Sequence, residues 1–504
     1  MKLKCKIVDI LSAAPMAGMD PRDCEALIVK ENDRIRIGGP KGETVASIIC
    51  SDKFSDAGTL FIPESVARAI GAKEGDELDV VYSQPPESVR AIRRKMDGQK
   101  LGAEEITAIV KDISEGSLTN IEVASWLTSL QINGMDLDET ADFARAMVDT
   151  GDKVVFDKGP IFDFHSMGGV PGNKITPIVV SIAAAAGLIV PKTSSRAISS
   201  ACGTSDFVET FCDINVTLER LKELGETVGG AFVWGGSMNL APVDDIVIKI
   251  ERPLGINPRA KMLASIISKK LAIGANYLLI DIPTGAGTKV HTIEEARAYA
   301  QDFMGLGARL GIHVECAITY ADQPVGSAIG PILEARECIR ILEGETQPTS
   351  VVEKACECAG ILLEMAGFEN GREKAHELLR SGKAHKKFLE IVTAQGGRPD
   401  LKSTDLVPGK YTADVISSRS GYVNSIRNRD LVAVAKACGA SMDKGAGLLL
   451  CKTKGQRVEE GEVLFTLYAE SETKLKHAQE LAERYCPVQI EGMLLKRVTA
   501  QESD

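Results

Sequence analysis

Short apolar runs interrupted by turn residues dominate the first part of the chain. Gly, Asp and Asn separate these runs at close intervals, a pattern typical of the strands of a small barrel. We therefore predict a β-barrel module over residues 1–84, followed by a linker at 83–88 in which two adjacent prolines break regular structure. Its predicted strands are 2–10, 25–32, 33–39, 43–50, 58–71 and 76–82.

From Ala103 the spacing of apolar residues becomes helical. Segments 117–135 and 136–152 each begin with a capping signal and carry apolar residues at i, i+3 and i+4. Between about 160 and 400, strands alternate with helices, which predicts an α/β sheet with crossover helices. The predicted strands are 162–165, 187–193, 245–251, 276–284 and 313–320, and the predicted helices are 217–228, 258–275 and 293–311.

Near residue 410 a strand pattern returns, with predicted strands at 420–426, 446–452 and 463–470 and one or two helices. Together these patterns predict a multidomain α/β protein with four parts. They are a small N-terminal β-barrel (1–84), a helical domain (85–158) joined by a later helical segment, a large α/β domain (159–405), and a C-terminal α+β module (406–504).

Composition and charge narrow the function. The net charge of −11 over 504 residues argues against binding a nucleic-acid polymer, so any anion must be bound in a local pocket. The first residues lack a signal-peptide core and no apolar run has the length of a membrane span, which leads us to expect a cytoplasmic enzyme that does not bind membranes. The twelve cysteines are scattered, and most are expected to be small buried hydrophobes. Cys356 and Cys358 form a C-x-C pair without visible partners, so no metal site is predicted.

Two loops that follow predicted strands carry residues suited to phosphate. The segment 163–176 has glycines at 168, 169 and 172, which let the backbone approach a ligand, and it leads into a helix whose first N–H groups could bind an anion. It lacks the spacing of a Walker loop. Residues 193–205 contain seven hydroxyls and Arg196, whose guanidinium can bind phosphate with two parallel hydrogen bonds. Loops at the carboxyl ends of strands line the binding crevice of α/β sheets.

Two further segments are candidates. Ser265 and Lys269 are four residues apart on one face of a predicted helix. Lys289 ends a Gly-rich loop after the predicted strand 276–284. Among the six histidines, only His165 falls in a candidate site, and no Ser–His–Asp order or zinc-binding H-E-x-x-H pattern occurs.

Taken together, these segments resemble the thymidine phosphorylase family, the second class of nucleoside phosphorylases. The resemblance covers about residues 95–495: segment 120–152 is similar to the family's helical signature, HSMGGV to its phosphate loop, SIISKK to its base-side helix and 443–471 to its C-terminal module. Several matches in the same order make the resemblance specific.

The chain differs from the pyrimidine enzymes of that family in four features, and in all four it resembles the archaeal AMP phosphorylases. Phe164 stands where those enzymes have Lys, SRAISSACGT replaces their Gly-rich loop, and Ile250 replaces the arginine that points at the pyrimidine. The 84-residue N-terminal module is the fourth difference. The resemblance implies that the serine-rich loop binds the 5′-phosphate of AMP or a related nucleoside monophosphate.

The same resemblance assigns residue roles. Inorganic phosphate is expected to be bound by Ser166, Ser194 and Thr204. Further candidates for the site are His165 and Lys269. Asn257 stands where AMP phosphorylases place an Asp that donates a proton to the base, and Asn has no titratable proton to give. The residues expected to contact the nucleotide are Gly169, Ser195, Arg196, Ala197, Ile198, Ser199, Ser200, Thr204, Ser265 and Lys289.

The implied reaction is attack of inorganic phosphate on C1′ of the ribose, with no metal and no organic cofactor. Closure of the helical domain on the α/β domain would exclude water. The family forms symmetric assemblies, which implies at least a homodimer. The alternatives are a pyrimidine nucleoside phosphorylase and, because of Asn257, an inactive or binding-only protein. An anthranilate phosphoribosyltransferase should show acidic Mg–pyrophosphate motifs and a biotinyl or lipoyl carrier should show a tip lysine, and neither feature is found.

Overall fold

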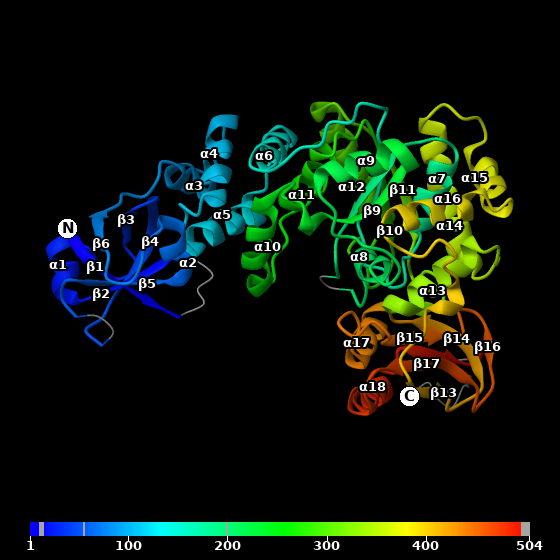
Figure 1. Ribbon diagram of the computed structural model, residues 1–504. Coiled ribbons are helices and arrows are strands. Elements are labelled where there is room, and N and C mark those ends of the chain that lie inside the picture. The colour runs from blue at the N-terminus through cyan, green and yellow to red at the C-terminus, as the bar shows by residue number, and fades with distance from the viewer. Residues whose placement is uncertain (10–14, 54–55, 198–199, 495–504) are drawn as a thin grey trace, which may run out of the picture. The chain divides into compact units, whose positions relative to one another are not determined.

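The computed structural model describes residues 1–9, 15–53, 56–197 and 200–494, which form two compact units (Figure 1). Unit 1 comprises Met1–Gly151 and Ala241–Ser268, and unit 2 comprises Asp152–Leu240 and Lys269–Asp504. The multidomain α/β prediction is confirmed: unit 1 holds a closed barrel and helices, and unit 2 holds parallel strands, their covering helices and the C-terminal sheets.

The N-terminal barrel closes with the strand order β1-β5-β2-β4-β3-β6 (Figure 1). Closure leaves no unpaired sheet edge, and alternate residues such as Leu3, Ile35 and Leu60 fill the interior because successive side chains in a strand point to opposite faces. The strands are β1 (Lys2–Val8), β2 (Met16–Met19), β3 (Arg34–Gly39), β4 (Gly42–Cys50), β5 (Thr59–Pro63) and β6 (Glu77–Tyr82).

Two segments of the barrel predicted as strands differ in the structure. None of 25–32 is a strand: residues 25–27 end helix α1 (Pro21–Leu27) and 28–32 form turns and irregular backbone. Helix α1 starts with Asp20 as its N-cap and Pro21 in its first turn, both strong helix-start signals. The end of 58–71 is helix α2 (Glu64–Ile70), closed by Gly71 in the left-handed region. A disulfide, which the sequence did not predict, joins Cys24 to Cys50. Of the ten free cysteines, six are buried, in line with the expectation of small buried hydrophobes.

Helices make up the rest of unit 1. Thr119 and Asp136 cap α5 and α6 through capping boxes, as their sequence signals predicted. The predicted strand 245–251 is wrong: it lies inside α10, which has Pro242 in its first turn and buries Val243 and Val247, one turn apart. The helices are α3 (Ser88–Met96), α4 (Ala103–Ser114), α5 (Asn120–Asn133), α6 (Leu137–Asp149), α10 (Pro242–Leu254) and α11 (Arg259–Ala272), which crosses the unit boundary.

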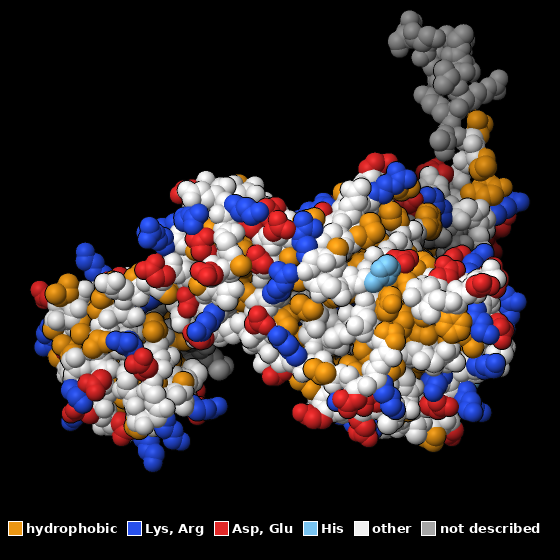
Figure 2. Space-filling model, turned by 90° about the horizontal axis from the view of Figure 1, so that it is seen from above, with side chains coloured by type: hydrophobic (Ala, Val, Ile, Leu, Met, Phe, Trp, Pro, Cys, Tyr) orange, Lys and Arg blue, Asp and Glu red, His pale blue; other side chains and the backbone are white. Residues whose placement is uncertain are grey.

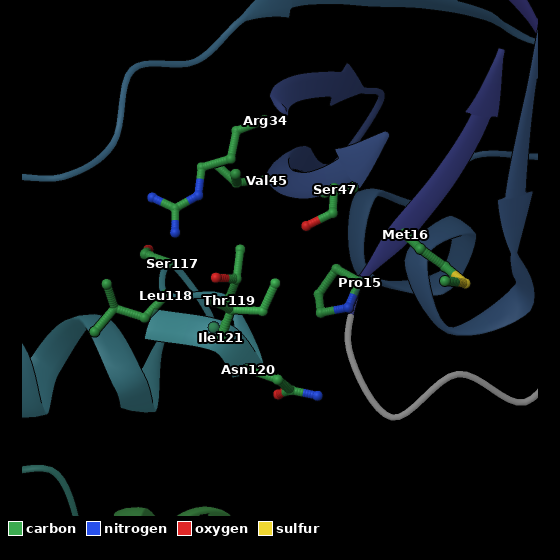
Figure 3. Close-up of a pocket in the computed structure, with 12 residues that line it drawn as sticks. Pro15, Met16, Arg34, Val45, Ser47, Ser117, Leu118, Thr119, Asn120 and Ile121 are labelled. Carbon is green, nitrogen blue, oxygen red and sulfur yellow. The ribbon is translucent and has the colours of Figure 1, made fainter. Parts of the chain in front are cut away.

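A cavity of about 190 Å³ lies between the barrel and the start of α5, with Arg34, Ser47 and Thr119 in its wall (Figure 3). Arg34 lies on β3 and pairs with Glu122 on α5, and its side chain is only 5% exposed. This ion pair connects the barrel to the helical part of unit 1. None of the predicted site residues lines the cavity.

We expect Glu122→Gln to lower the free energy of unfolding of unit 1 by about 3 kcal/mol, because a buried guanidinium loses its counter-charge. Gln can still serve the capping box, so the loss reports on the ion pair rather than on the cap. Urea unfolding checks this. Glu64→Gln, which removes an exposed partner of Arg68, should leave the midpoint unchanged. An equal effect of both substitutions would contradict the assignment.

The α/β part of unit 2 is built on parallel strands. Strands pair in the order β11-β10-β7, β8 pairs with β9, and a bridge between Ile161 and Ile189 connects the two sets. Strand β9 was not predicted. Helices α14 and α16 both pack against α7, in a core that includes Ile178, Leu362 and Ile391 (Figure 1). The strands are β7 (Phe162–Ser166), β8 (Val190–Ser194), β9 (Gly230–Trp234), β10 (Tyr277–Thr284) and β11 (His313–Tyr320).

The helices of this part are α7 (Thr176–Ala185), α8 (Thr204–Val208), α9 (Leu218–Val228), α12 (Ile293–Leu310), α13 (Pro331–Leu342), α14 (Thr349–Met365), α15 (Gly371–Arg380) and α16 (Lys383–Ala394), with short 3-10 helices at Gly235–Ser237 and Ser403–Asp405.

The C-terminal module forms two small sheets, of order β12-β15-β17-β13 and β16-β14-β18, with its own apolar core. Its elements are β12 (Ala328–Ile329), β13 (Tyr411–Ile416), β14 (Gly421–Ile426), α17 (Asn428–Cys438), β15 (Gly447–Leu450), β16 (Arg457–Val458), β17 (Val463–Ala469), α18 (Glu472–Tyr485) and β18 (Val488–Glu491). On the face shown in Figure 2, basic and acidic side chains are interspersed. Within the described chain, no helix has both the length and the apolar character needed to cross a membrane.

Candidate functional site

The predicted phosphate residues lie where parallel strands end. Ser166 ends β7 and is level with Asp281 on β10, and Ser194 ends β8 and is level with Trp234 at the end of β9. Because these strands are parallel, their carboxyl ends meet at one edge of the sheet, which is the edge where α/β proteins bind ligands. Ser166 and Ser194 therefore belong to the same edge.

The loop after β7 makes a close contact with the loop after β10. Gly168, Gly169 and Gly172 all have φ between 71° and 90°, a conformation that favours glycine. A Cβ added at Gly169 would lie 2.8 Å from the backbone nitrogen of Lys289. The structure thus brings two of the predicted nucleotide contacts, Gly169 and Lys289, side by side.

Gly169→Ala is expected to reduce catalytic efficiency at least about tenfold with little loss of secondary structure, since displacing a positioning loop by 1 Å is costly. The new methyl group must push the Lys289 loop away while residue 169 keeps a positive φ of 90°. Steady-state kinetics and circular dichroism would check this. Gly367→Ala is a matched control for strain alone, because its φ is also 90° but no atom lies within 4 Å. Similar losses in both variants would argue against a role for the loop contact.

Ser166 is held by a polar network around Asp281. Its hydroxyl donates to Asp281 Oδ2 at 2.7 Å and accepts from the side-chain amide of Asn173 at 2.9 Å. Asp281 is fully buried, accepts from Thr319 at 2.5 Å and pairs with Lys354 at 3.0 Å. With its proton committed to Asp281, Ser166 has a fixed orientation at the end of β7.

Four lysines act electrostatically on His165, and we call Lys192, Lys269, Lys270 and Lys289 the lysine cluster. Burial lowers the pKa of His165 well below its usual range, and the positive charges of these four lysines lower it further. His165 is therefore neutral near pH 7. A neutral imidazole carries one donor and one acceptor nitrogen, so it can take part in hydrogen bonding without adding charge.

Two members of the lysine cluster share one buried carboxylate. Lys270 Nζ lies 2.7 Å from Asp163 Oδ2, and Lys192 Nζ lies 3.9 Å from Asp163 Oδ1. Lys192, Lys270 and Asp163 are at most 3% exposed. Burial, and then the charge of Lys270, lowers the pKa of Lys192 to about 7, while Asp163 acts in the opposite direction. The group carries an excess of positive charge, two residues before the end of β8 and three before the end of β7.

The serine-rich loop is organised by acidic residues of its own. Asp206 accepts from the backbone nitrogens of Ala197 and Gly203 at 2.8 and 2.9 Å. Arg196, expected to offer its guanidinium to a phosphate, instead donates two hydrogen bonds to Glu209 and lies 4.8 Å from the ring centre of Trp234. Glu209 also pairs with Lys444 of the C-terminal module, and these cations lower its pKa to about 2.

Three of the loop's hydroxyl-bearing residues, Ser195, Ser200 and Thr204, are at least partly accessible, as is Ser194. Ser200 donates to the carbonyl oxygen of Cys202 at 2.9 Å. Two further predicted contacts, Ile198 and Ser199, lie outside the described residues. The accessible hydroxyls keep this loop a candidate for a phosphate group.

Ser265 and Lys269 both lie on α11, but Ser265 belongs to unit 1 and Lys269 to unit 2. Asn257, just before this helix, also belongs to unit 1. Ser265 donates to the buried Asp244 at 2.7 Å, which leaves its lone pairs to accept a hydrogen bond. Asp244 also pairs with Lys261 at 3.3 Å. Asn257 is exposed in the loop between α10 and α11.

Several important residues were missed from the sequence. Asp163, Lys192 and Lys270 were not predicted, although each adjoins a predicted residue or loop. Asp244 and Asp281 were also missed, and both orient a serine. A useful signal was a charged residue inside an apolar strand, as at Asp163 and Asp281, because buried charges are rare unless paired. No group of three or more His, Cys, Asp or Glu suited to a metal occurs in the part of the chain that is described.

Three family descriptions match successive parts of the chain. They are "Glycosyl transferase family, helical bundle domain" at residues 89–151, "Glycosyl transferase family, a/b domain" at 158–385 and "Pyrimidine nucleoside phosphorylase C-terminal domain" at 422–489. The fold is similar to that of the anthranilate phosphoribosyltransferase from Thermus thermophilus, with a TM-score of 0.52 and 21% identity over 61% of this chain and 99% of that one.

Full-length similarity is much stronger to archaeal proteins. The chain is 48% identical to the AMP phosphorylase of Thermococcus kodakarensis and 46% identical to that of Methanocaldococcus jannaschii, over 99% of each chain in both cases. It is 43% identical to AMP phosphorylase 1 of Archaeoglobus fulgidus over 95% of both chains. Identity at this level over the barrel, helical, α/β and C-terminal parts shows that the chain belongs to the AMP phosphorylase family.

Proposed function

We propose that this protein cleaves AMP with inorganic phosphate, giving adenine and α-D-ribose 1,5-bisphosphate, and that it also accepts CMP and UMP. The observation that carries the proposal is the lysine cluster at the carboxyl edge of the sheet, a local excess of positive charge in a chain of net charge −11. It is suited to anions. The full-length relatives support the choice of AMP, because their printed name is AMP phosphorylase.

In the proposed reaction, a phosphate oxygen forms a bond to C1′ as the bond from C1′ to N9 of adenine breaks. The electron pair of the broken bond goes to the base, and the proton that the phosphate dianion gives up ends on the base. Positive charge develops on the ribose and is stabilised by the attacking anion. Phosphate would lie beside His165, Ser166, Ser194 and Thr204. His165, Ser194 and Thr204 would donate to it as preorganised groups, whereas Ser166, whose proton goes to Asp281, would accept from the protonated phosphate oxygen.

The nucleotide would contact Gly169, Lys289, Ser265 and the serine-rich loop 195–204. We propose that the accessible hydroxyls of that loop bind the 5′-phosphate while Arg196 holds the loop against Glu209. Ser265, held as an acceptor by Asp244, suits a donor on the base or the ribose. Asn257 occupies the proton-donor position of the family. A carboxylic acid at this position, unlike the amide of Asn257, would protonate the base and assist its departure.

We further propose that the reaction needs no metal or organic cofactor, because phosphorolysis requires only charge stabilisation and proton transfer, and both fall to side chains. The protein would act in the cytoplasm as a homodimer or larger homo-oligomer. Size-exclusion chromatography with light scattering tests the oligomer, and activity after exhaustive chelation tests the metal requirement. A monomer, or activity lost on chelation and restored by a divalent cation, would contradict these points.

The test of the function is incubation with AMP, with and without phosphate, followed by chromatography of free adenine. CMP, UMP, thymidine and uridine run in parallel. Phosphate-dependent release of adenine, with both nucleosides untouched, supports the proposal. Turnover of thymidine or uridine would instead indicate a pyrimidine nucleoside phosphorylase and would remove the role given to the serine-rich loop. Phosphate-independent release would indicate hydrolysis.

A further inference from the structure

The lysine cluster contains two ammonium groups that are too buried for ordinary solvation. Lys192 comes from β8 and Lys270 from α11, and Asp163 from β7 is the one carboxylate that both approach among the described residues. Lys270 also donates to Thr193 Oγ1 at 3.3 Å, and Lys192 donates to the carbonyl oxygen of Thr193. Buried charges are costly unless paired, so two cations on one anion leave a deficit of negative charge.

This shortage of negative charge lies beside the position expected for inorganic phosphate. Asp163 and His165 are two residues apart on β7, so their side chains leave the strand on the same side. Thr193 immediately precedes Ser194 at the end of β8. The charges of Lys192 and Lys270 both reach His165. An anion at the end of these two strands would therefore be attracted by both lysines.

We propose that Lys192 and Lys270, held by Asp163, are positioning residues that supply the positive potential for binding inorganic phosphate as its dianion. This inference rests on the proposed function, and it assigns roles to residues that the sequence did not indicate. Neither lysine needs to touch phosphate, because charges interact over several ångströms in a poorly solvated site. Asp163 keeps both ammonium groups in place without cancelling their combined charge.

The arrangement couples phosphate binding to a proton. The pKa of Lys192 is lowered to about 7 by burial and by Lys270. At about pH 8 much of Lys192 is therefore neutral in the free protein. A phosphate dianion favours the charged form and raises this pKa, so binding takes up a proton. The other charged or titratable groups facing the site are Asp163, His165, Lys269, Lys270 and Lys289.

The experiment is calorimetric titration of the full-length protein with inorganic phosphate alone, at about pH 8, in two buffers of different ionisation enthalpy. The wild type should take up a fraction of a proton per phosphate bound. Lys192→Met should weaken binding at least about tenfold, equivalent to about 1.4 kcal/mol, and should abolish the uptake. Lys270→Met should weaken binding similarly. Lys192→Arg should bind phosphate but take up no proton, because a guanidinium stays charged at this pH.

The matched control is Lys95→Met, which removes another buried lysine paired with one buried carboxylate, Glu139, at 2.8 Å in unit 1. It should leave phosphate affinity and proton uptake unchanged. Wild-type affinity in Lys192→Met, proton uptake persisting in Lys192→Arg, or no binding by the wild type would each overturn the inference. If Lys192→Met does not fold, the Arg variant and Lys192→Gln still decide the point. The titration contains no AMP, so it tests phosphate binding alone. A protein that binds phosphate in the titration but releases no adenine in the AMP assay would contradict the proposed function and leave this inference standing.

Discussion

Asn257→Asp is expected to raise the rate of adenine release from AMP by about 10² or more, because a positioned general acid contributes about 10²–10⁴ to a rate. The base leaves poorly as an anion, and the resemblance to AMP phosphorylases implies an Asp at this position as its proton donor. Asn257 lies in the exposed loop before α11, so the substitution changes one amide to a carboxyl group without disturbing a core. The measurement is kcat for AMP as a function of pH.

The pH profile distinguishes a new acid from a general improvement. In Asn257→Asp, kcat should fall as pH rises above the pKa of the new carboxyl, because only its protonated form can donate. The wild type should lack that limb. Asn257→Ser, which is also uncharged and polar, is the matched control and should remain at the wild-type rate. An equal gain with Ser, or no gain with Asp, would mean that another group protonates the base.

Asp163→Asn is expected to lower the free energy of unfolding by about 3–5 kcal/mol, the usual cost of removing one partner of a buried ion pair. Lys192 and Lys270 would then lie buried with no carboxylate beside them. Thermal and urea unfolding at constant ionic strength measure the loss. Asp157→Asn, which removes an exposed partner of Lys222, should have no measurable effect.

The loss should also depend on pH with a definite sign. A lysine whose pKa is lowered in the folded protein destabilises the fold while it is charged, below that pKa. Between the folded pKa, about 7 for Lys192, and the unfolded value near 10.5, the unfolded chain binds more protons and stability rises with pH. Without the charge of Asp163 the pKa of Lys192 falls further, so the deficit of Asp163→Asn should shrink as the pH rises towards about 7 and stay constant above it. A deficit independent of pH would show that the lysines do not carry it.

Much of the fold could be predicted because local signals agreed with tertiary structure. The capping boxes at Thr119 and Asp136 and the apolar strand at 277–284 are strong local signals. Segment 245–251 was wrongly predicted as a strand because its β-branched residues favour strands. The signals for a helix, Pro242 and the acidic first turn of α10, lie at or before the start of the segment. Strand β9 is only five residues long and resembles any apolar segment.

The candidate site was predictable only in part, for a related reason. Gly169, Ser166 and Lys289 lie in loops with recognisable chemistry, and the register of β7 and β10 explains why two of those loops meet. The pairing of Asp163 with Lys192 and Lys270 depends on three elements distant in sequence, which no local pattern encodes. The same holds for Arg196, whose partner Glu209 could not be distinguished from a phosphate by residue type.

The bond between Cys24 and Cys50 has a consequence for the denatured chain. It closes a loop with a sequence separation of 26 residues, which restricts the unfolded ensemble of the barrel and, on the chain-entropy estimate, favours folding by about 3.5 kcal/mol. That contribution exists only while both sulfurs are oxidised. The barrel would thus lose tolerance to heat under reducing conditions while the sheets of unit 2, whose described cysteines are free thiols, would not respond. Reductant is therefore expected to lower the stability of the first domain while leaving that of unit 2 unchanged.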